Sequence, residues 1–239
     1  MKNSILTLFI IPIFFLGPFQ INAQKAPVVL ELFTSQGCSS CPPADKLLND
    51  VKADNVIALS YHVDYWNYIG WKDPFSSDKF TAKQRQYGLK FNNSTIYSPQ
   101  MVVNGEEHFV GSDEFKLTQK IRSYSKKDAK AKIRLSDVRQ NEDLVTFSYN
   151  AEGDYLGNYI RVILVIDKRV TEVKRGENRN KTLVNSNIVV SEQEFKLDKG
   201  VGKGRIAIPD IVNDNDSLSL VVLIETKTLD ILAGDTSSL

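Results

Sequence analysis

The first half of the chain alternates between apolar strand patterns and helical stripes. Apolar runs predict strands at residues 28–33 and 56–63, and the spacing of Leu47, Leu48 and Val51 predicts a helix between them. The further elements predicted here are a helix over 78–91 capped by Ser77, strands at 100–103 and 107–110 joined by an Asn104-Gly105 turn, and a helix from near Ser112 to Ser125. The predicted order is β-α-β-α-β-β-α.

The second half, after a charged stretch at residues 125–132, carries strand patterns only. Val145, Phe147 and Tyr149 alternate on one face, as in a half-buried strand, whereas residues 160–166 are almost continuously apolar, as in a central strand. The predicted strands are 132–138, 144–150, 159–167, 187–191, 194–198, 205–209 and 218–225. Many short strands with polar turns predict a β-sandwich.

The N-terminus predicts a cleaved signal peptide over residues 1–23. Lys2 precedes roughly a dozen apolar residues, too few to span a bilayer, and Ala23 is a small residue suited to cleavage. The mature protein is therefore expected to be periplasmic or secreted and free of the membrane. Within it we expect an α/β domain over 25–125 and an all-β sandwich-like domain over 131–239, each with its own core.

Charge and composition narrow the class of partner. The chain has 30 basic and 29 acidic residues and a net charge of +1, so neither a nucleic acid nor an anionic membrane is expected as a partner. Hydrophobic residues make up 42% of the chain, which is enough for the mature protein to fold throughout.

The two cysteines of the chain stand in the stretch TSQGCSSCPPAD, where the first strand ends and the first helix begins. Unpaired N–H groups at a helix start favour an anion, so Cys38 is the expected attacking thiolate and Cys41 the resolving thiol. The alternative is a static disulfide, although a bridge closing so short a loop restricts the unfolded chain little.

The expected strand directions bring further candidate site residues close to the cysteines. Parallel first and second strands leave Cys38 and the segment from His62 to Asp64 at one sheet edge, and an antiparallel third strand adds Ser98 and Pro99. His62 either assists the thiols, binds a metal with them, or is a core histidine oriented by Asp64.

Two more groups of residues are candidates for supporting roles. Glu31, on the first strand, is a possible acid for the proton of Cys41, if the strand register turns it towards the cysteines. The long segment after the second strand is either core filler or a wall for an unfolded polypeptide substrate. Its aromatic residues are Tyr65, Trp66, Tyr68 and Trp71.

The first half resembles the thioredoxin arrangement over most of residues 25–125. The element order, the Cys-x-x-Cys before the first helix, and YSPQMVVNGEE with a proline before the third strand carry this resemblance. It implies a thioredoxin-like fold for this domain. It also implies a cis Pro99 against the cysteine pair, which presents the Ser98 backbone to an extended substrate.

Longer stretches carry a more specific resemblance. ELFTSQGCSSCPPAD, YHVDYWNYIGWKDPF, YSPQMVVNG and RGENRNKTLVNSNIVV together resemble a family of exported bacterial proteins known as a domain of unknown function with a thioredoxin-like fold. Ser98 departs from the Thr more usual before this proline. The resemblance suggests that Arg175, Glu177 or Asn178 fixes the interface between the two domains.

The leading hypothesis is an exported thiol–disulfide oxidoreductase without a cofactor or metal. Cys38 would form a mixed disulfide with exported proteins that carry thiols or disulfides, Cys41 would resolve it, and an unknown redox partner would reset the pair. One alternative is a copper or other soft-metal chaperone that uses both thiolates and His62. Another is a non-catalytic binding protein whose β-sandwich holds the partner.

Overall fold

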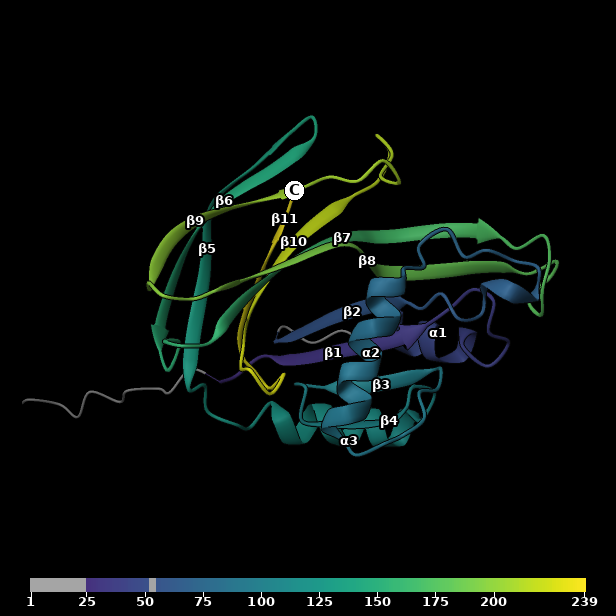
Figure 1. Ribbon diagram of the computed structural model, residues 1–239, viewed down its shortest axis with the longest axis horizontal. Helices are drawn as coiled ribbons and strands as arrows, with labels where there is room; N and C mark the ends of the chain where they lie inside the picture. Colours follow the sequence, from purple (N-terminus) through teal and green to yellow (C-terminus); the bar gives the residue numbers. More distant parts are fainter. Residues whose placement is uncertain (1–24, 52–54) are drawn as a thin grey trace, which may run out of the picture.

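The computed structural model describes residues 25–51 and 55–239, and its main feature is one mixed sheet of eight strands in the order β11-β10-β7-β8-β2-β1-β3-β4 (Figure 1). A second sheet has the order β5-β6-β9. The elements of the first half are β1 (Val28–Thr34), α1 (Pro42–Asp50), β2 (Val56–His62), η1 (Asn67–Ile69), α2 (Asp78–Lys90), β3 (Gln100–Val103), β4 (Glu107–Val110) and α3 (Glu114–Tyr124). The strands of the second half are β5 (Ala131–Asn141), β6 (Leu144–Gly153), β7 (Tyr159–Glu172), β8 (Thr182–Lys196), β9 (Val201–Ala207), β10 (Leu218–Glu225) and β11 (Ile231–Ser238).

The first half has the β-α-β-α-β-β-α order that its periodicity predicts. β1 runs parallel to β2 and antiparallel to β3. Pro42 and Pro43 stand in the first turn of α1, where a missing N–H leaves no hydrogen bond unmade. Ser77 caps α2 by accepting a hydrogen bond from the Lys79 N–H, as its sequence position predicts.

The predicted signal peptide, residues 1–23, lies outside the described residues. Among the helices that the structure does describe, none is long and apolar enough to cross a membrane.

The predicted fold class, an α/β thioredoxin-like domain followed by a separate β-sandwich domain, is wrong. β8 of the second half pairs in parallel with β2 at Ser60 and Ile188, and β7, β10 and β11 continue the same sheet. Within residues 25–51 and 55–239 no separate α/β domain is formed. The physical reason is that β2 would otherwise be an unpaired sheet edge, which β8 covers by pairing at this position. Among the described strands, β5, β6 and β9 form a sheet of their own.

The layers of the molecule also join the two halves. α1 and α3 pack on one face of β1 and β3, and the three-stranded sheet covers the same face of the second-half strands. α2 covers the opposite face. There a single apolar cluster contains Val29 and Phe33 of β1, Ile163 and Val165 of β7, and Leu223 of β10. The expectation of two independent cores therefore fails together with the fold class.

A buried ion network ties β1, β7 and β10 together. Arg161 Nη2 lies 2.5 Å from Glu31 Oε1, and Arg161 Nη1 donates to Glu225. All three residues are at most 1% exposed. Their burial is tolerated because the charges are paired and hydrogen-bonded. The other members of this network are Tyr61, Lys83, Tyr87 and Glu192.

Glycines of β9 make room for aromatic rings of β6. Gly204 pairs with Phe147, and a Cβ on Gly204 would lie 2.3 Å from Phe147 Cζ. We expect Gly204→Val to lower the free energy of unfolding by about 1–3 kcal/mol, because the ring must leave its buried position. Urea denaturation measures this loss. Val201→Ala, at a 70% exposed position of the same strand, is the control and should change stability by less than about 0.5 kcal/mol. Equal stability of both variants would contradict the ring packing.

Candidate functional site

Cys38 and Cys41 form a disulfide between the end of β1 and the start of α1. The Cys41 carbonyl accepts the N–H groups of Ala44 and Asp45 at 2.9 and 3.1 Å, so this residue begins the helix. Both cysteines are 0% exposed. An attacking thiolate must be accessible to its partner, so in this disulfide form a partner reaches the sulfurs only after surrounding residues move.

The segment before β3 covers the Cys38 sulfur. The Ser98–Pro99 peptide bond is cis, as the sequence resemblance implied. Ser98 Oγ lies 3.4 Å from Cys38 Sγ and accepts a hydrogen bond of 2.7 Å from Trp66 Nε1. The Ser40 hydroxyl lies 3.3 Å from the same sulfur. Two hydroxyl groups thus lie against the Cys38 sulfur, and the Trp66 indole holds one of them, that of Ser98.

The other aromatic residues of the long segment after β2 lie in three different surroundings. Trp71 Nε1 donates to the Gln36 side-chain oxygen at 3.1 Å and so supports the cysteine loop. Tyr65 packs against the apolar cluster beneath α2. Tyr68 is 82% exposed.

A buried polar cluster lies beneath the cysteine loop, on the α1 face of the sheet. Thr34 and His62 are registered neighbours on β1 and β2, and Thr34 Oγ1 donates to Asp45 Oδ1 at 2.8 Å. His62 Nδ1 lies 2.7 Å from Asp73 Oδ2, so Asp73, and not Asp64, orients the imidazole. The buried Nε2 of His62 has no hydrogen-bond partner among the described residues.

Within this cluster the pKa of Asp45 is shifted into the range near pH 6. Burial raises the pKa of Asp45 to about 6, although the His62 imidazolium opposes the shift. Burial disfavours protonation of His62, but the Asp73 carboxylate outweighs it and raises the pKa of His62. Asp45 therefore changes protonation near neutral pH. Asp45 follows Cys41 by one helical turn, a spacing at which two residues share a helix face.

Two predicted candidates lie elsewhere. Glu31 points to the face of β1 opposite α1, where it binds Arg161, so it is not placed to take the proton of Cys41. Asp64 accepts a hydrogen bond of 2.5 Å from Thr81 Oγ1 of α2. One feature of the sequence marks Asp45 as an acid near the cysteines, because it stands in the first turn of the helix that follows them.

The β7–β8 hairpin brings the second half of the chain to the cysteines. The hairpin crosses the molecule, and its tip reaches the end where α1 begins (Figure 1). Asn178 is fully buried and donates through Nδ2 to the carbonyls of Gln36 and Cys38, at 2.9 Å each. Glu177 Oε2 accepts a hydrogen bond of 3.1 Å from the Ser39 N–H. Two of the three residues suggested for the contact between the halves thus touch the cysteine loop itself.

The copper hypothesis requires Cys38, Cys41 and His62 to share one ion. His62 uses Nδ1 for Asp73. In the described part of the chain, no three His, Cys, Asp or Glu side chains are grouped so as to hold a metal ion. The geometry therefore offers no observation in favour of this alternative.

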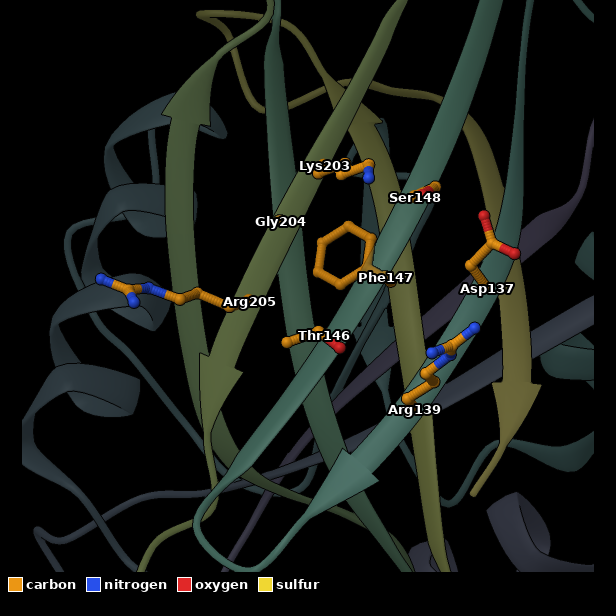
Figure 2. A pocket seen from close by; sticks show the side chains of 8 residues that line it. All are labelled: Asp137, Arg139, Thr146, Phe147, Ser148, Lys203, Gly204 and Arg205. Carbon is orange, nitrogen blue, oxygen red and sulfur yellow. The ribbon is translucent and has the colours of Figure 1, made fainter.

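An open pocket lies on the three-stranded sheet, and Figure 2 shows the side chains that line it. Its lining residues are Asp137, Arg139, Thr146, Phe147, Ser148, Lys203, Gly204 and Arg205. None of the residues that the sequence singled out for chemistry is among them, so we assign the pocket no part in the redox site.

A solved structure shares the overall fold. The X-ray structure of protein AGR_C_4864 from Agrobacterium tumefaciens is similar over 90% of this chain and 95% of that chain, with a TM-score of 0.68 and 25% sequence identity. OgpA from Akkermansia muciniphila matches 45% of this chain and 28% of its own, with a TM-score of 0.27 and 12% identity, which is too low to carry an argument. No curated protein matches the chain. Residues 29–225 match the family described as "Protein of unknown function (DUF1223)", and the chain belongs to this family.

Proposed function

We propose that the protein is an exported thiol–disulfide oxidoreductase that acts on thiols and disulfides of other proteins through Cys38 and Cys41. The observation that carries this proposal is a disulfide at the start of a helix with a buried acid one turn behind it, whose pKa is about 6. A disulfide that only stabilises the fold needs no such acid. The position of the pair between β1 and α1, with Ser98 beside Cys38, supports thioredoxin-like chemistry without a separate thioredoxin-like domain.

The proposed exchange has two steps. In the reduced protein the Cys38 thiolate attacks a partner disulfide, a bond forms between Cys38 and one partner sulfur, and the other partner sulfur leaves as a thiolate. Cys41 then gives its proton to Asp45 and attacks the Cys38 sulfur, which releases the second partner sulfur and forms the Cys38–Cys41 disulfide. The partner gains two electrons, and its two thiolates take up one proton from Asp45 and one from solvent. The reverse sequence oxidises a partner dithiol.

The compartment and partner classes of this proposal come from the sequence. The signal-peptide pattern of residues 1–23 supports export to the periplasm or beyond, where disulfides persist. The partners proposed are exported proteins with thiols or disulfides and one further redox protein that resets the pair.

Replacing Cys41 by serine tests the proposal directly. Attack by Cys38 still occurs, but resolution fails, so Cys41→Ser should accumulate mixed disulfides with exported proteins, visible on non-reducing gels and identified by mass spectrometry. Cys38→Ser is the matched control and should accumulate almost none.

In the reduced protein Cys38 should be alkylated faster than Cys41, with a thiol pKa below the roughly 8.5 of a free cysteine. Equal alkylation rates and an absence of trapped partners would make the pair structural.

A further inference from the structure

The contact between Glu177 and Ser39 places a carboxylate beside Cys38, in the loop between β1 and α1. Ser39 directly follows Cys38, and its N–H donates to Glu177 Oε2 at 3.1 Å. This hydrogen bond lowers the pKa of Glu177, so the group is anionic at neutral pH. A like charge nearby disfavours the charged form of a titrating group. Glu177 therefore occupies the backbone donor next to Cys38 and places a negative charge close to the position of a Cys38 thiolate.

The rest of the hairpin holds Glu177 in this position. Asn178 is buried against the carbonyls of Gln36 and Cys38, and Lys181 Nζ donates to Asn178 Oδ1 at 3.0 Å. The other charged groups of the hairpin tip are Glu172, Lys174, Arg175 and Arg179, and Lys174 pairs with Glu172. Glu177 is thus the carboxylate that the hairpin directs to the cysteine loop, while Glu172 is neutralised locally.

We propose that Glu177 couples the β7–β8 hairpin to the redox state of the pair, because the docked carboxylate and a Cys38 thiolate would be like charges on neighbouring residues of one loop. The docked hairpin stabilises the disulfide, and reduction weakens the docking by the same factor. Glu177 is a positioning residue that acts through Ser39. Undocking also loosens the loop around the two buried sulfurs, which a partner must reach. The inference rests on the proposed function, since the coupling matters only in a protein whose cysteines cycle.

Glu177→Gln keeps a hydrogen-bond acceptor and removes the charge. In glutathione redox buffers near pH 8, the dithiol-to-disulfide ratio of the purified variant should exceed that of the wild type roughly two- to fivefold, the range expected for a pair of charges near the protein surface. The difference should shrink at lower pH, where Cys38 is a neutral thiol, and in high salt. Glu172→Gln, on the same hairpin, is the matched control and should leave the ratio unchanged. The same shift in both variants, or none in Glu177→Gln at any pH, would overturn the inference.

Limited trypsin digestion gives an independent readout of docking. Cleavage after Arg175 and Arg179 should be faster in the reduced protein than in the disulfide form, and Glu177→Gln should reduce that difference. Equal cleavage in both redox states would contradict the coupling. These measurements use the purified protein and glutathione alone, so they succeed or fail independently of whether Cys41→Ser traps partner proteins.

Discussion

Replacing Arg161 by leucine is expected to lower the free energy of unfolding by about 3–5 kcal/mol at neutral pH, a large part of the stability of an ordinary domain. The change leaves the carboxylates of Glu31 and Glu225 buried without their shared cation. Burial already raises the pKa of Glu225 with Arg161 in place. In the variant Glu225 loses the cation that opposes this shift, so the folded state binds its proton more tightly than the unfolded chain does, and this contribution to stability is lost as the pH rises.

Urea denaturation at pH 5 and pH 7 measures this loss and its pH dependence. Arg134→Leu is the matched control, because Arg134 lies 3.6 Å from Asp235 in a pair whose arginine side chain is 59% exposed. Exposed pairs of this kind contribute less than about 1 kcal/mol. A second variant, Arg161→Leu with Glu225→Gln, should recover part of the lost stability by removing one buried charge. Similar losses for Arg161→Leu and Arg134→Leu would show that the network does not join the two halves.

Local sequence patterns predicted the helices and strands of this protein better than the way in which they pair into sheets. The helices and strands of the first half follow from periodicity and caps that lie within a few residues of each other. β8, in contrast, was expected as two strands, 187–191 and 194–198, because polar Glu192 and Gln193 interrupt its apolar pattern. In the structure Glu192 accepts hydrogen bonds from Lys83 and Tyr61, so the interruption is a buried polar contact within one strand.

The joining of the two halves depends on pairs that are far apart in the sequence. β2 and β8 share one registered pair, Ser60 and Ile188, and no local pattern specifies it. One signal was nevertheless present. Arg161 and Glu31 each stand in an otherwise apolar strand, and a charge in such a strand requires a buried partner. Opposite charges in two buried strands indicate a shared core.

The candidate site was predictable where it depends on strand polarity. Parallel β1 and β2 and antiparallel β3 bring Ser98 to Cys38, as the connection pattern predicted. The choice of Asp73 as the partner of His62 depends on the path of the long segment after β2, which has no regular pattern. A hairpin from the second half holds the cysteine loop through Glu177 and Asn178, and this contact followed only from resemblance.

Replacing Asp45 by asparagine is expected to stabilise the protein above pH 6. The pKa of Asp45 is about 6 in the folded protein against 3.8 for an ordinary aspartate, so between these pH values the folded state holds a proton that the unfolded chain has lost. Stability is therefore lost as the pH rises through this window, by at most about 3 kcal/mol. Asparagine does not titrate, and the advantage of the variant should grow from pH 4 to pH 7. Asp50→Asn, at an exposed position of the same helix, should show no such growth.

The same Asp45→Asn variant should close the disulfide slowly, because Cys41 loses the group that accepts its proton. General-base contributions of this kind are about 100-fold or more, so formation of the Cys38–Cys41 bond from a Cys38 mixed disulfide should slow by about that factor near pH 7. The deficit should narrow at higher pH, where solvent hydroxide deprotonates Cys41 without help. Rapid-quench measurements of glutathione release follow this step. A variant that gains stability above pH 6 and still resolves at the wild-type rate would show that the buried acid serves no proton transfer, and the observation that carries the proposed function would lose its force.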